Sequence, residues 1–267
     1  MKIFLLGGTK DSINIIKHIK DNYNDYILTT TTTQYGANLA LEAGSDEVIG
    51  NALLKDEIIN IIKKDNYDLL VDATHPFAAH ITQTSSRIAN ELNIPYIRFE
   101  RPITNLKNID TSHIDYVDSF DDAGKLIKMK YPSGNILHFA GANTMGEILR
   151  YVEVERFYPR ILKVKSSLEK CEKLNVNPSH IISMNGAATL DENIQLIERY
   201  GGKVIITKES GDIGGVIEKI EAARLKNINV IMIKRPMIEN LNENDVVSNI
   251  DEFDDKLNFY RNKVLFD

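Results

Sequence analysis

The chain has 267 residues, 43% of them hydrophobic, and carries 32 lysines and arginines against 38 aspartates and glutamates. This length is sufficient for one large domain or two small ones. The net charge of −6, without basic runs, argues against a nucleic-acid partner, because such partners are bound by clustered Lys and Arg. Cys171 is the only cysteine, which excludes an intrachain disulfide and a cysteine-based zinc site. The apolar N-terminal run stops at Gly7, so neither a membrane span nor a secretion signal fits, and we expect a cytoplasmic protein.

Short runs of Ile, Val and Leu alternate along the chain with stretches of helical periodicity. This pattern is typical of an α/β protein with a parallel sheet, whose strands are buried on both faces. Strands are predicted over residues 2–6, 26–30, 69–73, 95–99, 135–140, 160–164, 180–183, 203–207 and 229–233. Helices are predicted over 79–92, over 189–199, where Thr189 and Glu192 form a capping box, and over 251–267.

Residues 102–114 follow neither a strand nor a helix period, and they mark the expected boundary between two βα lobes. We place the lobes at residues 1–104 and 105–267. The run 94–102 resembles the run 228–236, which is explained either by an internal duplication or by chance likeness of two βα units. Ligands of open α/β sheets lie beyond the carboxyl ends of strands, which directs attention to the loops 74–78 and 209–215.

The first strand ends in Gly7-Gly8-Thr9, directly before a helix. Glycines there let a phosphate approach the backbone, and the helix N-terminus supplies N–H donors; a generic tight turn is the alternative. The second strand ends in the hydroxyl run Thr29–Thr33, with Thr30 a candidate for cofactor contact. No acidic residue for a ribose hydroxyl and no Arg for a 2′-phosphate stands there, so the choice between NADH and NADPH stays open.

The stretch from Asp72 to Ala78 places an acid, a hydroxyl, an imidazole and an aromatic ring at the exit of a buried strand. His75 is a candidate proton donor near neutral pH, and Asp72 either orients it or caps the next helix. The alternative is a structural turn histidine.

The stretch from Thr207 to Gly215 occupies the corresponding place in the second lobe. Lys208, Ser210 and the glycines after them favour an anion cradle, against the alternative of a flexible loop with a solvated lysine. The other histidines lack the spacing of metal ligands, and no metal site is predicted.

In order along the chain, the Gly7-Gly8-Thr9 turn, Tyr35-Gly36-Ala37, the Asp72–Ala78 block, Arg98–Pro102, Thr207–Gly211, Ala222-Ala223 and Lys234-Arg235-Pro236 resemble the precorrin-6A reductase family, which includes the cobalt-precorrin-6A reductases. The resemblance implies two Rossmann-like lobes, each with a mainly parallel sheet flanked by helices, and a ligand cleft between them. It also implies an oxidoreductase of cobalamin biosynthesis that uses NADPH or NADH to reduce a double bond of a tetrapyrrole, converting (cobalt-)precorrin-6A to (cobalt-)precorrin-6B. The Lys-, Asn- and Ile-rich composition favours the cobalt-containing substrate.

Motifs and resemblance together assign three groups of site residues. The catalytic candidates are His75 and Asp72. The cofactor-binding candidates are Gly7, Gly8, Thr9, Thr30, Lys208, Ser210 and Gly211. The substrate-binding candidates are Thr74, Phe77, Arg98, Arg101, Gly186 and Thr189, with the alternative that the two arginines only cap the sheet edge.

Two loops depart from the family pattern. Residues 184–189 keep a glycine and a hydroxyl but lose the Pro and Phe of a G-P-F-S/T turn, and residues 139–144 keep one glycine of a T-G-S-K-like loop. Two other functions therefore stay open: a nucleotide-binding relative with altered or lost macrocycle activity, and another phospholigand enzyme on the same fold.

Overall fold

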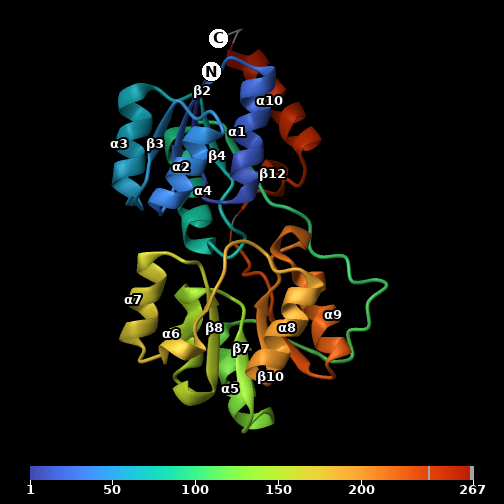
Figure 1. Cartoon of the computed structure of the whole chain (residues 1–267). Helices are drawn as coiled ribbons and strands as arrows, with labels where there is room; N and C mark the ends of the chain where they lie inside the picture. Colours follow the sequence, from blue (N-terminus) through green and yellow to red (C-terminus); the bar gives the residue numbers. More distant parts are fainter. Residues whose placement is uncertain (240, 265–267) are drawn as a thin grey trace. The chain divides into compact units, whose positions relative to one another are not determined.

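The computed structural model describes residues 1–239 and 241–264 and divides the chain into two compact units. Unit 1 comprises Met1–Pro102 and the segment that begins at Met237, and unit 2 comprises Ile103–Pro236. Each unit contains a six-stranded sheet with helices packed against it, and all the described neighbouring strands are parallel (Figure 1). The predicted α/β fold is confirmed.

The main elements of unit 1 are β1 (Lys2–Leu6), α1 (Lys10–Asn22), β2 (Tyr26–Thr30), α2 (Gln34–Glu42), β3 (Glu47–Ile49), α3 (Lys55–Asp65), β4 (Leu69–Asp72), α4 (Ala79–Leu92), β5 (Tyr96–Phe99), β12 (Val246–Val247) and α10 (Ile250–Val264). The main elements of unit 2 are β6 (Ile114–Val117), α5 (Phe120–Lys130), β7 (Asn135–His138), α6 (Met145–Ile148), β8 (Phe157–Ile161), α7 (Lys165–Lys173), β9 (Ile182–Ser183), α8 (Leu190–Tyr200), β10 (Gly202–Lys208), α9 (Val216–Leu225) and β11 (Asn229–Ile233).

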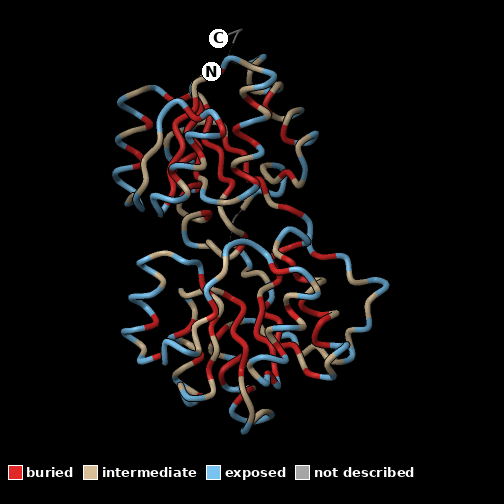
Figure 2. Tube along the Cα trace, in the orientation of Figure 1, coloured by how far each residue is buried: buried red, intermediate tan, exposed pale blue. Residues whose placement is uncertain are grey.

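The core of unit 1 lies on both faces of its sheet, because successive strand side chains point to opposite faces. Ile3 and Leu5 of β1 pack in one cluster with residues of α1, α2 and α10, while Phe4 and Leu6 pack in another with residues of α3 and α4. The central strands β1, β2 and β4 are therefore buried along most of their length, as Figure 2 shows. Among the described residues, no helix is long and apolar enough to cross a membrane.

The strand orders of the two sheets correspond. Unit 1 has the order β12-β5-β4-β1-β2-β3, and unit 2 has the order β6-β11-β10-β7-β8-β9. In each order the first strand comes from chain that follows a segment of the other unit. β12 comes after unit 2, and β6 comes after the first segment of unit 1. This correspondence agrees with an internal duplication, one of the two explanations left open for the likeness of the runs 94–102 and 228–236.

The C-terminal segment corrects the expected assignment of residues 105–267 to one lobe. The chain enters unit 2 at Ile103, close to the expected boundary, but returns to unit 1 at Met237. There β12 pairs with β5, and α10 places Phe253 and Leu257 in the core cluster that contains Phe99. A strand of two residues gives no periodic signal, so the return of the chain could not be recognised from the pattern.

Most predicted strands are found within a few residues of their expected positions. The exception is β8, which spans Phe157–Ile161 instead of the predicted 160–164. Proline is rare inside strands, and Pro159 lies in the part of β8 that the prediction left out. The short strands β3, β6 and β12 were not predicted. The predicted C-terminal helix is α10, and residues 265–267 of that prediction lie outside the described residues.

Candidate functional site

The turn after β1 is built around two glycines. The Gly7 N–H donates to the Thr30 carbonyl (2.8 Å), and a Cβ on Gly7 would lie 3.0 Å from Thr29 Cγ2 and 3.1 Å from Ser12 Oγ. Gly8 has φ +94°, a conformation that favours glycine. The first turn of α1 therefore follows directly on β1, with its N–H groups at the carboxyl edge of the sheet.

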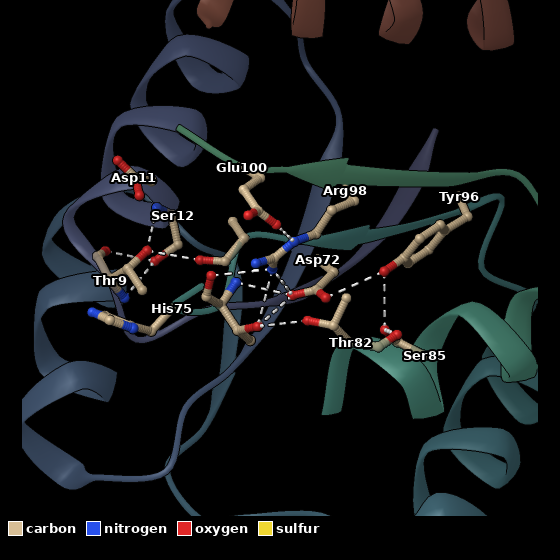
Figure 3. A network of polar contacts seen from close by, with 12 residues as sticks. Thr9, Asp11, Ser12, Asp72, His75, Thr82, Ser85, Tyr96, Arg98 and Glu100 are labelled. Atoms are coloured by element: carbon tan, nitrogen blue, oxygen red, sulfur yellow. Dashed lines mark hydrogen bonds and ion pairs between the residues drawn. The ribbon is translucent and has the colours of Figure 1, made fainter. Parts of the chain in front are cut away.

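Thr9 joins this turn to the neighbouring strand. Its hydroxyl accepts from the Ser12 N–H (3.1 Å), as the N-cap of α1, and donates to the Ala73 carbonyl at the end of β4 (2.7 Å). The Gly7–Thr9 turn and the Asp72–Ala78 block, predicted separately, thus lie together in unit 1 (Figure 3).

The hydroxyl run after β2 mostly serves the protein's own backbone. Thr29 Oγ1 lies 2.8 Å from Ser45 Oγ, Thr31 donates to the Thr33 carbonyl (2.9 Å), and Thr33 caps α2. Thr30 is 7% exposed, and its carbonyl accepts from Gly7. Thr30 consequently shapes the glycine turn through its backbone.

Asp72 and Arg98 form a fully buried ion pair at the ends of β4 and β5. Arg98 Nη1 lies 2.9 Å from Asp72 Oδ1, both side chains are 0% exposed, and the two residues are level in the parallel register. Arg98 Nε also lies 3.2 Å from Glu100 Oε2. Burial opposes the charge of Arg98, but Asp72 and Glu100 outweigh it and raise the pKa of the guanidinium.

The same pair fixes the Thr74 turn. The Thr74 N–H and hydroxyl both donate to Asp72 Oδ1 (2.9 and 2.7 Å), and Arg98 Nη1 donates to the Thr74 carbonyl (3.1 Å). Tyr96 donates to Asp72 Oδ2 (3.2 Å), and burial, together with the charge of Asp72, raises the pKa of its phenol well above the usual value. These contacts favour a structural role for Arg98 over that of a substrate anchor.

Arg101 is engaged in a similar way. Its Nη2 lies 2.7 Å from Asp11 Oδ2 in the first turn of α1, and the residue is 8% exposed. Of the two roles expected for Arg101, capping the sheet edge is the one its contacts favour.

His75 lies beside this network and points away from the Asp72–Arg98 pair in Figure 3. Its Nδ1 accepts from the Phe77 N–H (3.1 Å), so the neutral ring carries its proton on Nε2. His75 and Phe77 are both half-buried, with ring centroids 5.9 Å apart. Helix α4 begins at Ala79 with Ala78 as N-cap, so Asp72 does not cap it.

In unit 2 the loop after β10 is held from within. Glu209 accepts from the Thr104 N–H and hydroxyl (2.9 and 2.8 Å) and from the Gly211 N–H (3.1 Å), and its Oε2 lies 2.5 Å from Arg235 Nε. Burial alone would raise the pKa of Glu209, but these contacts outweigh burial, and the pKa lies below its usual value. Ser210 packs on Gly214 so closely that a Cβ there would lie 1.8 Å from the Ser210 hydroxyl.

The loop 184–189 lies against this loop. A Cβ on Gly215 would lie 3.0 Å from Ala187 Cβ, while a Cβ on Gly186 or on Gly141 would meet open space. Thr189 Oγ1 accepts from the Glu192 N–H as the N-cap of α8, which confirms the predicted capping box and involves the Thr189 hydroxyl in the cap. Residues expected to contact different ligands are thus gathered at one edge of this sheet.

Two basic residues at this edge, Arg160 and Lys219, escaped the sequence analysis because neither belongs to a glycine-rich motif. Lys219 is 3% exposed, although it lies on a helix whose pattern predicts no special role for it. The one available sign was that a basic residue lies on the buried face of α9. No group of three or more His, Cys, Asp or Glu side chains in the described part of the chain could hold a metal ion.

Comparison with known proteins gives matches over most of the chain. A family model described as precorrin-6x reductase CbiJ/CobK matches residues 2–258. The chain is 36% identical over 256 residues to a cobalt-precorrin-6A reductase of Methanothermobacter thermautotrophicus, covering 96% of this chain and 83% of that protein. It is 38% identical over 240 residues to the enzyme of the same name from Methanococcus maripaludis, covering 89% and 92%.

A solved structure named CobK precorrin-6A reductase aligns with 97% of this chain and 97% of its own, with a TM-score of 0.75 and 15% identity. This likeness shows a shared fold, and the sequence matches show the family. The chain belongs to the precorrin-6x reductase CbiJ/CobK family, a family of oxidoreductases of cobalamin biosynthesis.

Proposed function

We propose that this protein reduces a double bond of cobalt-precorrin-6A with NADPH or NADH and releases cobalt-precorrin-6B. The relatives at 36–38% identity carry the name of the cobalt-containing substrate, and this likeness carries the proposal. The metal-free macrocycle is the alternative substrate. The reduction adds one hydride and one proton across the double bond, and the reduced nicotinamide is oxidised in the same step.

The residues of the first turn fit a nucleotide. Gly7 has no room for a side chain, Gly8 adopts a positive φ, and the first turn of α1 offers backbone N–H groups to a phosphate. The reduced nicotinamide supplies the hydride when bound. Gly7, Gly8 and Thr9 would hold one anionic part of it, with Thr30 supporting the turn, and Lys208, Ser210 and Gly211 would face another anionic part.

His75 is proposed as the group that donates a proton or a hydrogen bond to the substrate. Its Nδ1 accepts from the Phe77 N–H, so the neutral ring carries its N–H donor on Nε2. Phe77 presents an aromatic surface suited to a flat macrocycle, and Thr74, Gly186 and Thr189 remain proposed substrate contacts. Asp72 acts through Arg98 and Thr74, by positioning the turn that carries His75.

The proposal is tested by anaerobic titration of the full chain with NADPH and with NADH, followed by addition of cobalt-precorrin-6A. Nucleotide fluorescence reports binding, and loss of absorbance at the nicotinamide band reports oxidation. Oxidation that depends on the macrocycle supports the reductase. Binding without oxidation would instead indicate a relative that has lost macrocycle activity.

A further inference from the structure

Three basic side chains from three elements lie at the carboxyl edge of the sheet of unit 2. Strands β8, β7 and β10 are neighbours, with Pro159 and Ile206 both level with His138. Arg160 follows Pro159 directly, and Lys208 ends β10 two residues after Ile206. Lys219 comes from the first turns of α9, and Arg160 and Lys208 both act on it electrostatically.

Two of these side chains are held inside the unit. Lys219 Nζ donates to the Gly214 carbonyl (2.7 Å), which fixes the ammonium beside the glycine-rich loop before α9. The Arg160 guanidinium lies over the Phe139 ring, 4.7 Å from its centroid. Arg160 Nη1 is buried, and within the described structure it has no hydrogen-bond partner. An unpaired buried N–H of a guanidinium is costly, so this atom favours a ligand oxygen.

The cluster carries more positive than negative charge. Burial lowers the pKa of Lys219 to about 7, and repulsion by Arg160 and Lys208 lowers it as well. Glu218 acts in the opposite direction and raises it. Burial also lowers the pKa of Lys208 to about 8 and that of Arg160 to about 10, the latter opposed by Glu192. A bound anion would relieve this repulsion, because it adds a negative charge near the three cations.

The backbone around the cluster suits a compact anion. Helix α9 begins after Gly215, whose φ is +64°, and its first-turn N–H groups have no partner within the helix. Gly215 lies against Ala187, so the loop 184–189 borders the same place, and the positions beyond Gly186 and Gly141 are open. Three cations beside a helix N-terminus match a doubly charged phosphoryl group better than a single carboxylate.

We propose that Arg160, Lys208 and Lys219 form a binding subsite for a phosphoryl group in unit 2, and that this group belongs to the nicotinamide nucleotide. The identity of the nucleotide rests on the proposed function. The macrocycle also carries oxyanions, as carboxylates, so the experiment separates the two sources.

The test measures binding of inorganic pyrophosphate and of tricarballylate, a tricarboxylate, to the full chain by calorimetry. The variants Lys219→Met and Arg160→Gln each remove one charge of the cluster. Lys219→Met also removes a buried charge and is not expected to unfold the protein, which circular dichroism checks. Lys203→Met is the matched control. Lys203 is exposed and lies near the start of β10, at the opposite end of the strand from Lys208.

Wild type and Lys203→Met should bind pyrophosphate equally, and each cluster variant should bind it about tenfold more weakly. Tricarballylate should bind wild type more weakly than pyrophosphate. Equal pyrophosphate binding by all four proteins, or none by wild type, overturns the subsite. Tighter binding of tricarballylate overturns its assignment to phosphate and indicates a carboxylate site.

The two proposals fail separately. Pyrophosphate binding that the cluster variants weaken, without macrocycle-dependent oxidation of NADPH or NADH, retains the subsite and rejects the reductase. Macrocycle-dependent oxidation with an unchanged nucleotide KM in Lys219→Met and Arg160→Gln retains the reductase and rejects the subsite.

Discussion

Arg98 on β5 and Asp72 on β4 are level in adjacent parallel strands, and Arg98 Nη1 donates to Asp72 Oδ1 at 2.9 Å with both side chains fully buried. The pair connects the sheet to the Thr74 turn, because both residues also bond Thr74. The geometry around His75 therefore depends on an ion pair that lies inside the protein.

Replacing Asp72 by Asn should destabilise the protein by about 3–5 kcal/mol, because it leaves the Arg98 charge buried without its main partner. Unfolding in urea measures the loss. Glu91→Gln, which breaks the exposed Lys55–Glu91 pair, is the control and should leave the unfolding midpoint nearly unchanged. Equal midpoints for Asp72→Asn and wild type would show that the pair contributes little.

Replacing His75 by Ala should lower macrocycle-dependent turnover about 100-fold, since a positioned acid contributes on that order. Nucleotide affinity and the unfolding midpoint should change little, because the hydrogen bond from the Phe77 N–H to the ring lies within the local turn. His80→Ala is the control, because His80 is exposed five residues further along. Wild-type turnover in a folded His75→Ala protein would remove His75 from the reaction.

Replacing Gly7 by Ala should weaken nucleotide binding and cost about 1–3 kcal/mol of stability, because the new Cβ meets Thr29 and Ser12 at 3.0 and 3.1 Å. Fluorescence titration with NADPH and NADH, together with urea unfolding, measures both effects. Gly146→Ala is the matched control. A Cβ there has no neighbour closer than 3.9 Å, so it should stabilise α6 by about 0.5–1 kcal/mol. Undiminished nucleotide binding by Gly7→Ala would contradict the role of this turn.

Anion binding in unit 2 should weaken as the pH rises from 6.5 to 9. The pKa of Lys219 is lowered to about 7 and that of Lys208 to about 8, so both lose charge in this range in the free protein. A bound anion favours their charged forms, and binding at pH 8 should take up protons. Sulfate is the probe, because its own charge is constant across this range.

Calorimetry in two buffers of different ionisation enthalpy measures the proton uptake. Lys219→Met should lose part of it, whereas Lys203→Met should retain all of it. A sulfate affinity that is constant or increases with pH would contradict the assignment of these lysines.

The pattern of buried strands predicted the α/β fold, and short local motifs predicted the capping box at Thr189 and the glycine turn at Gly7. It missed β12 because a strand of two residues has no period, and with it the return of the chain to unit 1. Motifs and resemblance suggested Arg98 as a substrate anchor or a cap of the sheet edge. The choice could not be made from the sequence, because neither the burial of Arg98 nor its pairing with Asp72 across strands is visible there. Lys219 was missed for the complementary reason: its burial follows from packing, and its neighbours in the sequence resemble any surface helix.

The most direct test of the central claim is mass spectrometry of the macrocycle after incubation of the protein with cobalt-precorrin-6A and NADPH or NADH deuterated at either face of nicotinamide C4. The account predicts a product that has gained two hydrogens, with deuterium incorporated from one face only. Recovery of the macrocycle at unchanged mass with both nucleotides, from folded protein that binds them, would contradict it.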